Sequence, residues 1–389
     1  MRNLAIATAL TFRKGKQICV VVSAMGKTTD MLTEHFLKAC ERKDKARELD
    51  DVLSMGERTS ARLFAAALKA QEVNVRYFDP SDPDWPIITD DNFGNARPII
   101  DECIQATKRT ILPMLEKGGV PVIPGFIGRT LRGEVTTLGR GGSDVTAFVL
   151  ARATKAKEVV IVTDVDGIMT ADPKIVSNPQ RIENINPRDL VNLCDSGVKF
   201  IRRKALKYLD GSFVVRIMGN HKSEFDSEGT IVTGRLPEKL DYLGHPSPVC
   251  VITVVSKGVA NEPRILLNIL ERISSNKIQI LARVIDVDSA CVCLPEAGAK
   301  EVVEAVHSTI IECELGSAMA LKKNLAFLRI IGVESENTSK VLRRVIGSLE
   351  QREIDIFGIH TVASNILIFV DWTEKDAALH AVKEAYELL

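Results

Sequence analysis

The stretch TTLGRGGSD, residues 136–144, describes a backbone folded tightly around an anion. Three glycines surround one arginine, and a hydroxyl and a carboxylate follow at Ser143 and Asp144. Glycine tolerates positive φ and lets backbone N–H groups approach a ligand closely. An apolar helical run, 145–150, comes next, so the stretch predicts an anion at the positive end of a helix. Clusters of glycine and arginine also occur in ordinary surface turns, so the neighbouring sequence is needed to distinguish an anion site from such a turn.

The flanking sequence places this stretch inside a unit of strand, loop, helix and strand. Upstream, the strand-like run 120–123 ends in PGFIG, 124–128. Downstream, the run 158–162 ends in TDVDGI, 163–168. A glycine loop between a strand and a helix is what a βαβ phosphate-binding unit requires. The order of elements therefore favours a phosphate and substrate site over a surface turn.

Length and composition predict two or three domains, because 389 residues exceed one typical core and 45% of them are hydrophobic. The 51 basic residues balance 51 acidic ones, which argues against a general attraction to nucleic acid or to a membrane. No apolar stretch is long enough to cross a bilayer. The eight cysteines form no CxxC pair, so we expect reduced, structural thiols in a cytoplasmic protein without a targeting signal.

The order of the expected elements divides the chain. In residues 1–240, helices alternate with short β-rich runs at 18–22, 73–78, 120–123, 158–162 and 214–217. This alternation is typical of an α/β sandwich around a mainly parallel sheet. The proline-containing stretch 234–248 is expected to be a linker. After it, 249–322 and 323–389 each show the order strand, helix, strand, strand, helix, which is an internal repeat.

Several separated motifs together resemble the aspartate kinases, within the amino-acid kinase superfamily. They are PGFIG, TTLGRGGSD, TDVDGI and DPK (172–174), with VSAMGKTTD (22–30), SMGERTSA (54–61) and ITDDNFGNARP (88–98). The two C-terminal blocks resemble tandem ACT domains. The resemblance implies an α/β/α sandwich catalytic domain at 1–240 and two βαββα ACT-type regulatory domains at 249–322 and 323–389. The alternative for the repeat is a block that only enlarges a dimer interface.

The resemblance implies phosphoryl transfer from ATP, with Mg²⁺, to the side-chain carboxylate of L-aspartate. The product, 4-phospho-L-aspartate, leads toward lysine, threonine and methionine. An aspartate carboxylate, with a pKa of about 3.9, is already an anion at neutral pH and needs no general base. Catalysis then rests on positioning and charge neutralisation. Feedback by lysine or threonine and a homodimer or higher homo-oligomer through the ACT domains are also implied.

The resemblance also assigns site residues. Arg140 would pair with the α-carboxylate of aspartate, Glu57 would face its amino group, and Thr137 and Ser143 would complete the pocket. The ATP contacts would be Gly141, Gly142, Thr163, Asp164, Lys174 and Lys199, with Asp144 and Lys199 acting in catalysis. From the residues alone, Glu57 is equally a helix N-terminal acid that favours the macrodipole, and Lys199 a solvated lysine. No protein metal cage is expected, because phosphate oxygens and water hold the metal.

The sequence departs from the aspartate kinase pattern in two places. The initial strand and Lys-Phe-Gly-Gly loop that hold the transferring phosphoryl group are absent, and residues 2–5 look like the helix that follows that loop. Arg202 and Arg203 stand where the family has a His-Pro. A truncated sequence would explain the first departure, and so would a catalytically silent amino-acid-binding subunit of a kinase. The GRGGSD, TDVDGI and GE motifs favour the enzyme.

Overall fold

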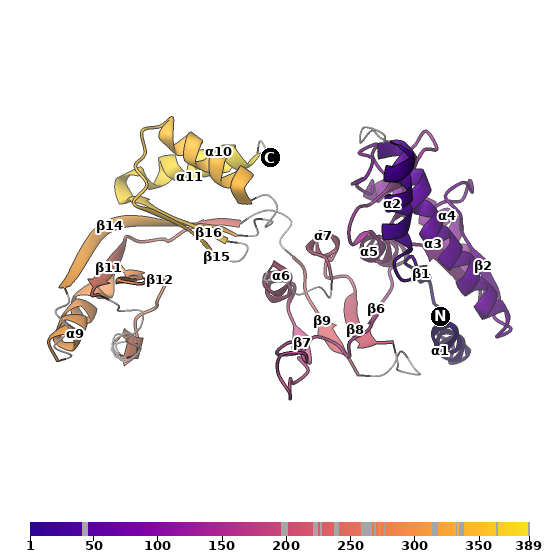
Figure 1. The fold of residues 1–389 in the computed structure, drawn as a ribbon, viewed down its shortest axis with the longest axis horizontal. Helices are drawn as coiled ribbons and strands as arrows, with labels where there is room; N and C mark the ends of the chain where they lie inside the picture. Colours follow the sequence, from indigo (N-terminus) through magenta and orange to yellow (C-terminus); the bar gives the residue numbers. More distant parts are fainter. Residues whose placement is uncertain are drawn as a thin grey trace. The chain divides into compact units, whose positions relative to one another are not determined.

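The computed structural model forms two compact units, unit 1 (Met1–Glu238) and unit 2 (Lys239–Leu389) (Figure 1). The residues that it describes are 1–40, 46–195, 201–220, 225, 228–236, 241–257, 267, 270–271, 273–275, 277–312, 318–331, 333, 338–362 and 365–387. None of the helices within these ranges is both long enough and apolar enough to span a bilayer.

Unit 1 alternates helices and strands as the sequence predicts. Its elements are α1 (Arg2–Arg13), β1 (Val20–Val22), α2 (Thr28–Ala39), α3 (Ala46–Lys69), β2 (Val75–Tyr77), α4 (Ile100–Glu116), β3 (Val120–Pro124), β4 (Ile127–Arg129), β5 (Val135–Thr137), α5 (Gly142–Thr154), β6 (Glu158–Thr163), β7 (Asn184–Ile185), α6 (Pro187–Asp195), α7 (Arg203–Leu206), β8 (Val214–Gly219) and β9 (Thr230–Val232). The five runs expected as strands are confirmed as β1, β2, β3, β6 and β8.

The strands of unit 1 form two larger sheets and a hairpin. One sheet has the order β1-β3-β2 and is parallel throughout. The other has the order β6-β8-β9-β7, with β6 and β8 parallel and β9 antiparallel to β8. β4 and β5 pair as an antiparallel hairpin. Helix α5 packs against both β1 and β6, so the helix that begins in the glycine loop contacts an edge strand of each sheet.

Helix α3 places polar groups at the site and apolar groups in the core. Its buried residues recur every three or four positions, which turns one helical face inward. Toward the C-terminal end this face is apolar, and Phe64 and Leu68 pack with Val120 and Val122 of β3. Toward the N-terminal end it is polar, with a buried carboxylate at Asp50 and another at Glu57. One helix therefore joins the core of unit 1 to the loops around the glycine stretch.

Unit 2 contains the two repeated blocks. Its described elements are β10 (Asp241–Gly244), β11 (Val249–Val255), β12 (Ala282–Asp286), β13 (Ser289–Pro295), the 3-10 turn η2 (Glu296–Gly298), α9 (Ala299–Glu312), β14 (Ala318–Ile331), α10 (Thr338–Glu350), β15 (Gly358–Val362), β16 (Asn365–Asp371), η4 (Trp372–Glu374) and α11 (Lys375–Glu387). The predicted order of strands and helices is confirmed for these elements. The helix expected between the first two strands of the first block lies largely outside the described residues.

One seven-stranded sheet runs through both blocks, in the order β12-β13-β11-β14-β16-β15 with β10 beside β14. The first part of β14 pairs with β11 and its last part with β16, so this 14-residue strand belongs to both blocks. The prediction of a linker at 234–248 is wrong for β10, which pairs with the last four residues of β14. The segment before the first block thus contributes a strand to the second.

Of the seven cysteines among the described residues, three are buried and four are half-buried. Burial raises the pKa of Cys19, Cys103 and Cys293 to about 12 and that of Cys250 to about 11. A thiol with such a pKa is protonated at neutral pH and is a poor nucleophile. These residues therefore act as small hydrophobic side chains.

Candidate functional site

The glycine stretch forms the turn between β5 and α5. Gly139 (φ +69°) and Gly141 (φ +79°) adopt the left-handed conformation that the sequence predicted, and Gly141 is the N-cap of α5. Ser143 and Asp144 lie in the first turn of this 13-residue helix. The N-terminal N–H groups of a helix have no partner within it, so this end attracts an anion.

A second turn, after β3, packs directly against the start of α5. A Cβ atom at Gly125 would lie 2.7 Å from Ser143 Cβ and 2.9 Å from Ser143 Cα. A Cβ at Gly142 would lie 2.9 Å from the Phe126 ring. Phe126 has φ +69°, an uncommon conformation for an aromatic residue, and its N–H donates to Thr146 Oγ1 (3.2 Å). The two turns can approach this closely only because glycine stands at both contacts.

Glu57 is a buried carboxylate, and one of its oxygens has no partner among the described residues. Its side chain is 4% exposed, and Oε1 accepts a hydrogen bond from the Ala24 N–H (3.2 Å) in the loop after β1. Oε2 is buried and accepts no hydrogen bond from any residue that the structure describes. Burial raises the pKa of Glu57 to about 7. An unsatisfied buried oxygen of this kind suits a ligand that brings its own donor or positive charge.

Arg140 extends from the centre of the glycine turn. It is exposed, and no acidic residue within the described ranges forms an ion pair with it. A planar guanidinium without a protein partner can form paired hydrogen bonds with a carboxylate. Ser143, two positions after Gly141, is half-buried at the same helix start. By contrast, Arg58 next to Glu57 is structural, because it binds both oxygens of Asp79 at 3.0 and 2.8 Å.

Asp144 lies within the same turn beside a basic residue that sequence reasoning did not place. Burial raises the pKa of Asp144 to about 6, while a hydrogen bond from the Arg202 N–H and the positive charge of Arg202 act in the opposite direction. A Cβ at Gly141 would lie 2.4 Å from Arg202 Cβ, so Arg202 borders the glycine turn. The Lys204 ammonium donates to the carbonyl of Leu138 in that turn. Two basic residues of segment 202–204 therefore adjoin the anion site.

Of the residues assigned to the nucleotide, Gly141 and Gly142 lie in the glycine turn, and Thr163, Asp164 and Lys174 lie at the end of β6 or after it. Thr163 ends this strand, and its hydroxyl donates to Asp164 (3.0 Å). Lys174 is exposed, and its backbone N–H donates to Asp172 (2.9 Å) in a local turn. Ligands in open α/β folds bind beyond the carboxyl ends of parallel strands, where Thr163 and Asp164 lie. Lys199 lies outside the described residues.

Sequence reasoning missed Asp50, a buried acid on α3. Its carboxylate accepts hydrogen bonds from the Thr137 N–H (2.8 Å), the Thr137 hydroxyl (2.6 Å) and the Gly94 N–H (2.8 Å). Thr137 itself is 1% exposed and ends β5. The spacing of seven residues between Asp50 and Glu57 puts both on one face of a helix and is the signal that could have found it.

The described residues contain no group of three or more His, Cys, Asp or Glu side chains that could hold a metal ion. The first turn of α5, at the anion site, contains one acid, Asp144. A single carboxylate can assist a cation that is carried mainly by phosphate oxygens and water.

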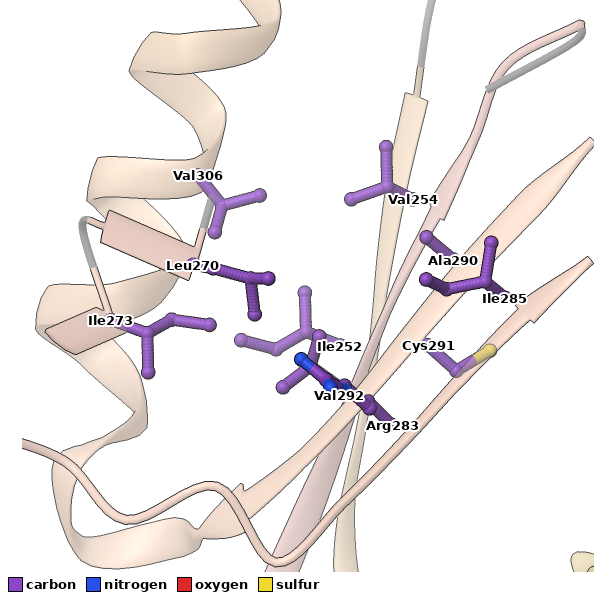
Figure 2. A pocket seen from close by; sticks show the side chains of 10 residues that line it. All are labelled: Ile252, Val254, Leu270, Ile273, Arg283, Ile285, Ala290, Cys291, Val292 and Val306. Atoms are coloured by element: carbon purple, nitrogen blue, oxygen red, sulfur yellow. The ribbon is translucent and has the colours of Figure 1, made fainter. Parts of the chain in front are cut away.

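Two hollows among the described residues of unit 2 differ in size and lining. Figure 2 shows the first, which lies between the sheet of the first block and helical residues including Leu270, Ile273 and Val306. Its volume is about 20 Å³, the space of about one water molecule. The second, of about 250 Å³, is lined by both blocks and includes the polar side chains of Thr253, Arg283 and His360. Of these two hollows of the described residues, the second has room for an amino acid.

Comparison with known proteins identifies relatives of the whole chain. Residues 1–219 match the amino acid kinase family. The aspartokinase of Helicobacter pylori is 30% identical over 409 aligned residues, which cover 100% of this chain and 95% of the relative. That of Thermus thermophilus is 29% identical over 385 residues, covering 96% and 92%.

Solved structures show the same fold. Aspartate kinase from Synechocystis has a TM-score of 0.79 at 23% identity and covers 99% of this chain and 66% of that chain. Aspartokinase III of E. coli, in complex with aspartate and ADP, has a TM-score of 0.51 at 23% identity and covers 99% and 96%. The match to the family over more than half of the chain, together with the full-length relatives, shows that this chain belongs to the amino acid kinase family and, within it, to the aspartokinases.

Proposed function

We propose that this chain uses MgATP to phosphorylate the side-chain carboxylate of L-aspartate, with 4-phospho-L-aspartate and ADP as products. The observation that carries the proposal is the presence, in one unit, of two groups that have no such partner among the described residues: the Arg140 guanidinium, without an ion pair, and the buried Glu57 Oε2, without a hydrogen bond. They suit the α-carboxylate and the α-ammonium group of an amino acid, respectively. Ser143 and Thr137, on either side of Arg140 in the sequence, would complete the pocket.

The chemistry needs charge neutralisation more than proton transfer. The attacking carboxylate is already ionised at neutral pH and approaches a negative triphosphate. The start of α5 at Gly141 and Gly142 would border the phosphate with the positive end of the helix, and Lys174 and Lys199 would add positive charge. The Gly142 N–H itself donates to the Gly139 carbonyl (2.9 Å). Mg²⁺ on the phosphates would neutralise further charge, with Asp144 orienting the lysines. Thr163 and Asp164 would border the adenosine.

The direct test is aspartate-dependent formation of an acyl phosphate from MgATP, trapped with hydroxylamine as the hydroxamate. We expect product with L-aspartate and none when either aspartate or ATP is omitted. L-Glutamate, which carries one more methylene, serves as the control for the length of the pocket. A folded chain that binds L-aspartate and forms no hydroxamate would instead support a catalytically silent amino-acid-binding subunit.

We also propose that unit 2 regulates the enzyme. Its two ACT-type blocks, 249–322 and 323–389, support feedback by an end-product amino acid, lysine or threonine, and homodimer formation in the cytoplasm. The hollow of about 250 Å³ between the blocks is the candidate effector pocket, with Arg283 available to the effector's carboxylate.

The pH dependence of aspartate binding should depend on Glu57. Because the pKa of Glu57 is raised to about 7, its ionised fraction increases between pH 6 and 8. An ionised Glu57 attracts the substrate ammonium, so the KM for L-aspartate should fall as the pH rises through about 7. In Glu57→Gln the fall of the KM near pH 7 should vanish, and at pH 8 the KM should be higher than that of the unaltered chain. Asp144, with a pKa of about 6, is present in both proteins, so the difference between their profiles isolates Glu57.

The raised pKa of Glu57 should also affect the stability of the protein when no substrate is bound. The folded pKa of Glu57 lies above its ordinary value of 4.5, so the folded state binds more protons between pH 4.5 and 7. The contribution of Glu57 to stability is therefore lost as the pH rises through this window. The stability of Glu57→Gln, measured by thermal unfolding, should not show this decrease with pH. Parallel stability profiles of the two proteins from pH 4.5 to 8 would contradict the raised pKa.

A further inference from the structure

Asp50 and Thr137 form a buried connection between α3 and the glycine turn. Asp50 is 0% exposed, and its Oδ2 accepts from the N–H groups of both Thr137 and Gly94, each at 2.8 Å. Its Oδ1 accepts from the Thr137 hydroxyl at 2.6 Å. Burying a carboxylate is costly unless donors surround it, and here three donors do so. The interaction is specific to this turn, because two of the three donors belong to Thr137.

The loop that supplies Gly94 holds the glycine turn from another side. The Ala96 N–H donates to the Thr137 carbonyl (2.9 Å), so all hydrogen-bonding groups of Thr137 have partners. The Lys204 ammonium binds Asn95 Oδ1 (2.6 Å) and also the Leu138 carbonyl. Asp50 therefore fixes both the last residue of β5 and the loop that packs against it.

The position of Asp50 on α3 relates this connection to substrate binding. Asp50 and Glu57 are seven residues apart, about two helical turns on the same face. Thr137 is three residues before Arg140. The two groups proposed to bind opposite ends of the amino acid, Glu57 and Arg140, are thus joined through a short path: the helix, the Asp50 carboxylate and the first residues of the turn.

We propose that Asp50 is a positioning residue that sets the separation of Glu57 and Arg140, and so the fit of the α-ammonium and α-carboxylate of the amino-acid substrate. This inference rests on the proposed function. Asp50 itself makes no contact with the substrate. It acts through Thr137, and its loss should change the recognition of the amino acid while leaving the nucleotide loops after β6 in place.

The test compares Asp50→Ala with Asp51→Ala. Asp51 is the adjacent residue on α3, is exposed, and forms no side-chain hydrogen bond or ion pair with a described residue, so it is a matched control. We expect Asp50→Ala to raise the KM for L-aspartate at least about 30-fold, because small displacements of binding groups have large effects. The KM for MgATP should rise less, by no more than about fivefold, because Gly141 and Gly142 share this turn with Arg140 whereas Thr163 and Asp164 lie at the end of β6 or after it, where Asp50 makes no contact. Asp51→Ala should match the unaltered chain in both values.

Two further variants separate positioning from general stability. Asp50→Asn keeps an oxygen for the two backbone N–H groups and can donate to the Thr137 hydroxyl, so it should bring the KM for L-aspartate back to within about fivefold of the unaltered chain. Thr137→Val removes the hydroxyl at nearly constant volume. Because both act on one contact, the double variant Asp50→Asn/Thr137→Val should be no worse than the poorer single variant.

The results distinguish this inference from the proposed function. If the unaltered chain forms no hydroxamate, the function fails. If it is active and Asp50→Ala either equals Asp51→Ala or raises the KM of both substrates equally, the positioning role is wrong. If Asp50→Ala does not fold, Asp50→Asn decides: additive effects of Asp50→Asn and Thr137→Val on kcat/KM for L-aspartate would overturn the role, and non-additive effects would support it.

Discussion

Replacing Arg140 by alanine should raise the KM for L-aspartate by about 10²- to 10³-fold and leave the KM for MgATP within about threefold. The guanidinium would no longer pair with the substrate's α-carboxylate, and that anion would lie near the glycine turn without its partner. Arg140 is exposed and forms no ion pair with a described residue, so the variant should fold normally. The measurement is steady-state hydroxamate formation with each substrate varied in turn, beside thermal unfolding.

Two variants control for charge and geometry at Arg140. Arg132→Ala makes the same charge change at an exposed position in the turn between β4 and β5 and should leave both KM values unaltered. Arg140→Lys keeps the charge without the planar fork and should give an intermediate KM for L-aspartate. An equal rise in the KM of both substrates for Arg140→Ala would contradict the assignment of Arg140 to the amino acid.

Replacing Gly125 by alanine should lower kcat/KM for both substrates about 100-fold. The added Cβ would lie 2.7 Å from Ser143 Cβ and 2.9 Å from Ser143 Cα, and a backbone atom cannot move aside as a flexible side-chain end can. The first turn of α5, with Ser143 and Asp144, would shift, and overpacking of this kind costs about 1–3 kcal/mol of stability. Chemical denaturation and the hydroxamate assay measure the two effects.

The matched control for Gly125 is Gly347→Ala, the same substitution within α10. A Cβ at Gly347 would meet no atom within 4 Å, and alanine favours a helix more than glycine does, so stability should increase by about 0.5–1 kcal/mol without loss of activity. If Gly125→Ala is as stable and as active as the unaltered chain, the close contact between the turn after β3 and α5 has no functional importance.

The sequence predicted those parts of the fold that have a strong local pattern. β3 and β6 are continuous apolar runs next to glycine-containing loops, and both were predicted within one or two residues. β10 was not predicted, because its four residues, DYLG, carry no alternation and stand between prolines at positions 237 and 246. Its strand conformation comes from pairing with Leu328–Ile331, about 85 residues later, and no local signal records such a partner.

In the candidate site, too, some features were predictable from the local sequence and others were not. The glycine turn and its positive φ values at Gly139 and Gly141 were predictable, since the reason lies in the residues themselves. Phe126 was not, because an aromatic residue at φ +69° is tolerated only where the surrounding structure imposes it. The contacts of Asp50 with Thr137 and of Arg202 with Asp144 join residues 87 and 58 positions apart and depend on the complete fold.

The pairing of β10 with β14 determines where the first block could be removed from unit 2. The chain leaves β10 at Gly244, builds the first block, and returns in β14 at Leu328, which is the pairing partner of Gly244. The His245 N–H still binds the Phe327 carbonyl (2.9 Å), so the two ends of the first block start side by side. Geometrically, the first block is an insertion in the loop of a β-hairpin. A tight two-residue turn could replace the first block, and the second block would keep β10. Cutting the chain between the blocks would instead separate β10 from the second block.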